Sequence, residues 1–226
     1  MICLNMEAII RIYYFIGSLV CHQIPGRTLS IDEISLPLCA RDTGIYSGIF
    51  VVLVYCIVRG KIKADRVPST GVSVVLTLLM IPMMLDAVTS YVSIRQTDNI
   101  IRLVTGFFFG MSIAVFLIPA ANFKVYGVNK LKVIDGWFDL LILSGINILA
   151  CIVILRSGLP IWIVSTASIA GLIFVVGRII YTLIKLLNIG EPKRRVIYAS
   201  ALTVIAFGLL YIVKCFILVL INKIKF

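Results

Sequence analysis

Charged side chains are scarce in this chain of 226 residues. Asp, Glu, Lys and Arg together make up only 14% of it, whereas 61% of the residues are hydrophobic. A soluble domain is about 25% charged and about 45–50% apolar. Because so few charges cannot cover a water-facing surface, lipid must be the solvent for most of the chain. This composition excludes an ordinary soluble domain and predicts an integral membrane protein.

Three other features are missing. The formal net charge is +11, but the basic residues form no patches interleaved with aromatic residues, which argues against nucleic acid as a partner. Residues 1–21 lack a basic segment and a small-residue cleavage site, so we do not expect a cleavable signal there. The six cysteines are neither dense nor evenly spaced, which excludes a disulfide-rich scaffold. Lipid is therefore the first partner that the sequence predicts.

Long apolar runs predict the fold class, an all-α integral membrane protein. The chain is expected to be one polytopic helical bundle of about seven (six or seven) transmembrane helices, since each span takes roughly 20 residues. The first run is the weakest, because Asn5, Glu7 and Arg11 interrupt it, and it fits the membrane interface as well. The candidate spans are 2–21, 43–59, 70–94, 100–121, 137–156, 159–184 and 196–221.

No soluble domain or repeat separates these runs, so residues 1–226 are expected to form a single transmembrane domain. Its polar motifs lie within 21–110, and the helices of 137–221 are expected to be scaffold. The two halves look dissimilar, without the inverted repeat that is common in transporters.

Lysine and arginine are unevenly distributed over the connections between the runs. Alternate connections hold eleven of them, against five in the others. Cytoplasmic loops are the richer ones in membrane proteins. Loops 59–69, 122–136 and 185–195 are therefore expected in the cytoplasm, and loops 22–42 and 95–102 on the extracytoplasmic side.

Charges next to the cytoplasmic loops are expected to serve topology. Lys61 is interpreted as an anchor at the inner face. Asp135 and Asp139 are expected to cap the fifth span, and Arg178 and Lys185 can extend toward the inner surface.

The first polar motif contains two cysteines, the only histidine and an aspartate within 22 residues. Cys, His and carboxylate are ligands of zinc-like ions, so Cys21, His22, Cys39 and Asp42 are the candidate metal ligands, with fewer than four binding at once. The cofactor would be a divalent transition metal such as zinc. The spacing matches no standard zinc pattern, and two alternatives stay open. One is a Cys21–Cys39 disulfide or redox pair, natural outside the cytoplasm, and the other is a purely structural loop.

The second motif is Asp86, near the outer end of the third candidate span, with Thr89 and Ser90 on the same helical face. An ionisable group at membrane depth is costly, which favours a functional role as acid, base or ligand. The alternative is an ion pair with an arginine. Both interpretations stay open on the sequence alone.

Three arginines are expected near the same outer face: Arg41, Arg95 and Arg102. The second and fourth candidate spans enter the membrane from that side, so the positive ends of their helix dipoles point outward beside Arg41 and Arg102. This arrangement favours an anionic ligand, with simple anchoring to lipid phosphates as the alternative.

Glycines follow Arg102 at intervals of four residues, at Gly106 and Gly110. Small residues at this spacing form close helix contacts in membranes. We therefore expect this face of the fourth span to pack against another helix.

At these residues the chain resembles an uncharacterised prokaryotic membrane-protein family, domain of unknown function 2085. The resemblance rests on CHQIPGRT, PLCARDTGIYSG and LDAVTSYVSIRQTDNIIRLVTGFFFG, all before residue 112. The family often has a Cys-x-x-Cys where this chain has Cys39 and Asp42, and a glycine where it has Ala87. Aspartate can bind a metal but cannot form a disulfide, so a Cys-x-x-Cys redox pair is disfavoured here, whereas Cys21–Cys39 stays open. The resemblance implies a multi-spanning membrane protein and brings no established activity.

The leading hypothesis is a membrane-embedded metal-binding protein or enzyme with an extracytoplasmic site for an anionic or lipid-linked substrate. The metal ligands and arginines named above would bind, and Asp86 would be the catalytic group. The alternatives are a thiol–disulfide protein that uses Cys21 and Cys39, a transporter of ions or small solutes, and a structural membrane component. The sequence leaves enzymatic turnover and oligomeric state open.

Overall fold

The structure of the chain is a computed structural model that describes the backbone of residues 2–224 and the side chains of residues 8–191 and 194–217. Asn5 and Glu7, which interrupt the first apolar run, have side chains outside the described residues. The elements in chain order are α1 (Ile2–Gly17), η1 (Pro25–Arg27), β1 (Thr28–Ile31), β2 (Ile34–Cys39), α2 (Ala40–Val58), α3 (Thr70–Tyr91), α4 (Asn99–Asn122), α5 (Trp137–Leu155), α6 (Ile161–Leu186) and α7 (Pro192–Ile224).

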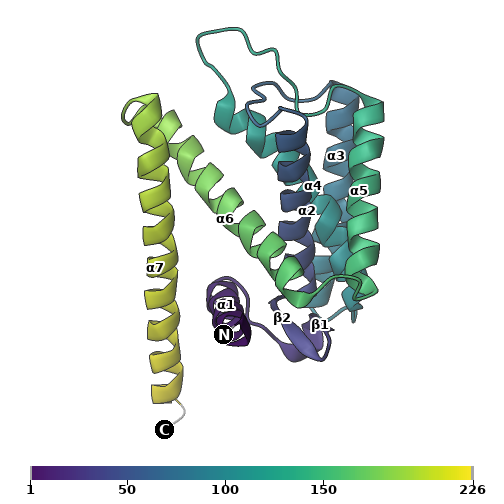
Figure 1. Ribbon diagram of the computed structural model, residues 1–226, viewed down its shortest axis with the longest axis vertical. Helices are drawn as coiled ribbons and strands as arrows, with labels where there is room; N and C mark the ends of the chain where they lie inside the picture. Colours follow the sequence, from purple (N-terminus) through teal and green to yellow (C-terminus); the bar gives the residue numbers. More distant parts are fainter. Residues whose placement is uncertain (1, 225–226) are drawn as a thin grey trace.

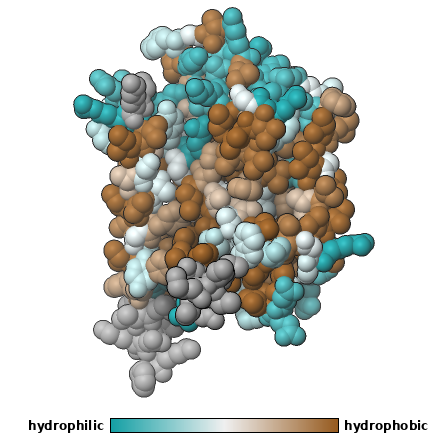
Figure 2. All heavy atoms as spheres, in the orientation of Figure 1, coloured by the Kyte–Doolittle hydropathy of each residue, from teal (hydrophilic) through white to brown (hydrophobic). Residues whose placement is uncertain are grey.

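Six helices of the described chain, α2 to α7, are long and apolar enough to cross a membrane. Each of them coincides within a few residues with one predicted span, which confirms the all-α membrane fold. Figure 2 shows the result on one face, with apolar side chains across the middle and polar ones gathered mostly at the top.

Helix α1 is the exception among the predicted spans. Its 16 residues reach about 24 Å at 1.5 Å per residue, short of the roughly 30 Å hydrocarbon core. Figure 1 shows it nearly end-on, whereas α7 runs lengthwise in the same view. The Tyr13 hydroxyl is 2.7 Å from Thr166 Oγ1 of α6, and the Tyr14 hydroxyl donates to the Ser35 carbonyl of β2. In the part of the chain that the structure describes, six helices are thus long and apolar enough to span, and α1 packs at one end of the bundle.

The two ends of the bundle carry different structures. One end, which we call the hairpin end, holds residues 18–39, the loop 92–98 and the turn before α6 (Figure 1). The opposite end, which we call the basic end, holds the loops before α3, α5 and α7.

A β-hairpin at the hairpin end was not predicted from the sequence. Strands β1 and β2 pair antiparallel, with Ile31 opposite Ile34. Asp32 and Glu33 form the two-residue connection with φ of 50° and 64°, the left-handed conformation that tight hairpins require. Leu36 and other apolar side chains of the strands are buried against the helices, so the hairpin is part of the core and not a free loop.

The closest helix contact joins α2 and α4 through glycines on both helices. Gly44 and Gly48 of α2 face Gly106 and Gly110 of α4. A Cβ on Gly106 would lie 2.5 Å from the carbonyl oxygen of Arg41, closer than any real Cβ contact, and the other three positions are tighter still. The predicted packing face of α4 is therefore confirmed, and its partner is α2.

The basic end is held together by buried charges. Lys61 Nζ lies 2.8 Å from Asp135 Oδ2 and 3.0 Å from Asp139 Oδ2. Burial acts to lower the pKa of Lys61, but the hydrogen bonds to these carboxylates outweigh it and raise that pKa. Asp139 also accepts the N–H of Asp135 at 3.0 Å, but neither aspartate caps α5 as expected, because Gly136 is the N-cap and no side chain bonds to it. Lys61 is only 6% exposed and joins its loop to α5 through Asp139.

We predict that Gly110→Ala destabilises the protein by about 1–3 kcal/mol, because the added methyl group forces α2 and α4 apart. The matched control is Gly145→Ala on α5, where an added Cβ meets nothing within 4 Å. The measurement is the loss of helical circular dichroism on heating in detergent. Equal melting temperatures for the two variants would contradict the packing described here.

Candidate functional site

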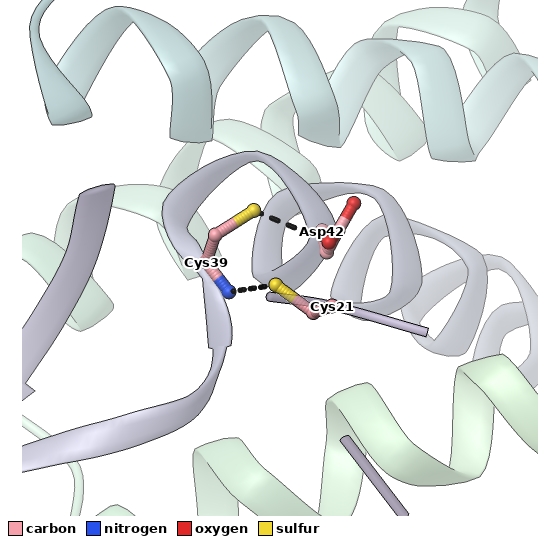
Figure 3. Close-up of side chains that lie close together, drawn as sticks. All are labelled: Cys21, Cys39 and Asp42. Atoms are coloured by element: carbon pink, nitrogen blue, oxygen red, sulfur yellow. Dashed lines mark hydrogen bonds between the residues drawn. The ribbon is translucent and has the colours of Figure 1, made fainter. Parts of the chain in front are cut away.

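Three potential ligand side chains meet at the start of α2. Cys39 precedes the helix and Asp42 lies one turn further on, so the two share one face. Cys21 reaches them from the segment after α1 (Figure 3). One ligand atom of each residue lies within 4.8 Å of the others. We call these three residues the thiol–carboxylate cluster.

Hydrogen bonds connect the members of the cluster. The Cys39 N–H donates to Cys21 Sγ at 3.3 Å, and Cys39 Sγ donates to Asp42 Oδ2 at 3.2 Å (Figure 3). Both cysteines are free thiols and half-buried.

Gln23 holds the Cys21 segment in place. Its backbone is left-handed, with φ of 51°, which turns the chain back toward the hairpin. Its side-chain amide donates to the Tyr14 carbonyl at 3.0 Å and to the Pro37 carbonyl at 2.9 Å. The segment after α1 is thereby tied to both α1 and β2, which fixes the approach of Cys21 to Cys39.

The two thiols differ in acidity. Hydrogen bonding with the Cys39 side chain lowers the pKa of Cys21, outweighing the effect of burial, and the N–H groups of Gln23 and Cys39 act in the same direction. The same interaction, together with burial and the charge of Asp42, raises the pKa of Cys39. Cys21 is therefore the thiol that ionises first, with Cys39 as a protonated donor beside it.

The cluster lies in the wall of a cavity of about 170 Å³. His22 also lines this cavity but is exposed and lies outside the three-residue cluster. Of the four metal ligands expected from the sequence, the structure thus brings three together.

Three arginines also line this cavity: Arg27, Arg41 and Arg102. Arg102 is only 7% exposed, and its Nη1 donates to Asn99 Oδ1 at 3.0 Å. Arg27 and Arg41 also line a second hollow, of about 350 Å³, against the end of α3. Arg95, expected beside them, is exposed and lines neither of these two cavities.

Sequence reasoning missed Arg27 as a site residue. It lies in η1, within the CHQIPGRT motif, and was counted only as a topology signal. Its place in the CHQIPGRT motif, close to Cys21 and His22, was the available signal.

Asp86 forms an ion pair and does not line the 170 Å³ cavity. Its Oδ2 lies 2.5 Å from Arg41 Nη2, and its side chain is only 3% exposed. Within the described chain, Asp86 Oδ1 and Arg41 Nε have no hydrogen-bond partner. Of the two roles expected from the sequence, this geometry supports the ion pair.

The fold and this site define a multi-spanning helical membrane protein with a polar site at one end of the bundle. Residues 21–116 match the family described as predicted membrane protein, DUF2085 (domain of unknown function 2085). The chain belongs to this family. The matched segment contains the cluster, the arginines of the cavity and the α2–α4 contact.

Two archaeal proteins are similar to part of this chain. An uncharacterized protein of Methanocaldococcus jannaschii is 32% identical over 114 residues, which are 50% of this chain and 70% of the relative. An uncharacterized protein of Methanothermobacter thermautotrophicus is 35% identical over 97 residues, which are 42% of this chain and 82% of the relative. No solved structure matches the chain.

We predict that Cys21 is alkylated by N-ethylmaleimide with a pH midpoint below that of an ordinary thiol, because its pKa is lowered. Cys39→Ala removes the main cause and moves the midpoint up, whereas Asp42→Asn removes a charge that raises the pKa and moves it down. Rates at Cys21 are followed by mass spectrometry with a chelator present. Buried Cys151 serves as the unreactive control. A midpoint that neither variant moves would rule out this electrostatic coupling.

We also predict that Asp86→Asn destabilises the protein by about 3 kcal/mol, since it leaves the Arg41 charge without its partner. Arg41→Gln should cost a similar amount, and the double variant should cost less than the sum of the two. Exposed Asp98→Asn is the control. The measurement is unfolding in detergent, and additive effects would show that the pair contributes nothing.

Proposed function

We propose that this protein binds a divalent transition metal such as zinc through Cys21, Cys39 and Asp42, and an anionic substrate through the arginines of the same cavity. The observation that carries this proposal is the convergence of three ligand atoms within 4.8 Å in the wall of a cavity lined by three arginines.

The donor set fits a zinc-like ion. Zinc takes thiolate and carboxylate ligands at about 2.0–2.3 Å, and catalytic zinc keeps three protein ligands and one open position. The pKa of Cys21 is lowered, and metal binding would displace the proton that Cys39 donates to Asp42. We assign His22 to the cavity wall, because it lies outside the cluster.

The arginines supply the anion preference. Arg41 lies in the first turn of α2 and Arg102 in the first turn of α4, where helix dipoles also favour negative charge. Arg27 approaches from η1. Asp86 neutralises one of the three guanidinium groups and holds Arg41 in place. The remaining positive charge favours a phosphate or carboxylate group in the cavity.

This set suits hydrolysis or transfer at a phosphorylated or carbonyl centre. A bound metal would polarise the substrate oxygen, and the arginines would orient the anionic group. Asp86 acts as a positioning residue in this proposal, not as the acid or base. The uneven distribution of Lys and Arg supports an extracytoplasmic position for the hairpin end.

A thiol–disulfide protein is the second candidate. Cys21 and Cys39 are adjacent free thiols of unequal acidity, which suits nucleophilic attack by Cys21. In exchange with a disulfide of another molecule, Cys21 and Cys39 would become a disulfide and the two sulfurs of the partner disulfide would become thiols.

We predict that protein purified without metal-affinity resin contains about one equivalent of transition metal by elemental analysis. Cys39→Ser and Asp42→Asn should lose it, whereas His22→Gln and Cys151→Ser should keep it. Absence of stoichiometric zinc, iron, nickel or copper from the wild type would reject the metal site. If Cys21 and Cys39 then also lose their free thiols under mild oxidation, the redox function takes its place.

A further inference from the structure

The cavity of the thiol–carboxylate cluster has an apolar groove behind one of its walls. The groove lies between the segment after α1 and the helix α7, with a volume of about 440 Å³. Ser18 and Leu19 form one side, and Leu210, Val213 and Ile217 form the other. Leu210 is 42% exposed and Val213 is 53% exposed on α7, so this groove opens to the lipid side of the bundle.

The wall between groove and cavity is a single segment of chain. Residues 20–23, from Val20 to Gln23, line both the groove and the cavity. Cys21 and His22 therefore face an apolar space on one side and the arginines on the other. In the view of Figure 1, α1 lies between α7 and the hairpin.

Lys214 places the groove at the membrane surface. It lies 20 residues after Arg194 on α7, which is about 30 Å along a helix, the thickness of the hydrocarbon core. Arg194 lies at the basic end, so Lys214 comes at the level of the lipid headgroups at the hairpin end. A lysine deeper in the membrane would be costly. Lys214 lines the groove, and its charge complements a phosphate that enters there.

We infer that the substrate is a lipid-linked phosphate that enters sideways from the membrane, with its hydrocarbon tail in the groove and its phosphate in the arginine-lined cavity. This inference rests on the proposed anion site and names the substrate class for it. A water-soluble anion would need the cavity alone and would gain nothing from an apolar groove against Cys21 and His22.

The test uses two probes that differ only in their tails, ethyl phosphate and hexyl phosphate. The chain of 226 residues in lipid nanodiscs is titrated by calorimetry, with empty nanodiscs as the reference. Complete burial of a methylene strengthens binding about four-fold, so a partly open groove should give hexyl phosphate at least roughly a ten-fold advantage over ethyl phosphate.

Val213→Trp fills the groove and should bring this advantage close to one, with ethyl phosphate binding retained. The matched control is Ile212→Trp, the neighbouring position on α7, which is 62% exposed and does not line the groove. This control should keep the advantage. Arg27→Gln should weaken both probes together.

The outcomes separate the two proposals. If ethyl phosphate binds but the tail gives no advantage, or if Val213→Trp leaves the advantage unchanged, the lipid inference is wrong and the anion site stands. If neither probe binds to the wild type, both the anion site and the lipid inference are overturned.

Discussion

The close approach of α2 and α4 is the contact on which the rest of the molecule depends. Lipid offers no hydrophobic driving force between two helices, so their association relies on van der Waals contact, which glycine permits at the shortest distance. Gly44 and Gly48 meet Gly106 and Gly110 so closely that backbone touches backbone. Since both helices begin at the hairpin end, this contact brings their N-termini together and surrounds one cavity with Arg41 and Arg102.

Pairing of charges is the second constraint. At the hairpin end the Asp86 carboxylate neutralises Arg41, which leaves Arg27 and Arg102 to give the cavity its positive character. At the basic end, Lys61 is instead fully paired with two aspartates. Buried charge needs a partner at both ends. At the basic end the charges of the cluster are paired with one another, whereas the cavity at the hairpin end keeps a net positive charge.

The fold was largely predictable from the sequence, and the site only in part. Runs of apolar residues predict the spans, and the spacing of Gly106 and Gly110 predicts the packing face of α4. The hairpin was missed because its two strands are short and their pairing is visible only once Ile31 meets Ile34. Arg95 was expected at the site and Arg27 was not. The reason is related, because the sequence places both near the outer face but does not show which of them lines the cavity.

The sequence by itself determined the solvent and the class of protein. A chain with 14% charged residues has to bury its surface in lipid, and its helices follow from the need to satisfy every backbone group there. Tertiary structure decided which of the candidate ligands meet. Cys21 and Cys39 are 18 residues apart, and the hairpin, hydrogen-bonded to Gln23, brings them together, whereas His22 lines the cavity but lies outside the cluster. Such convergence depends on packing between segments, which no local pattern of residues specifies.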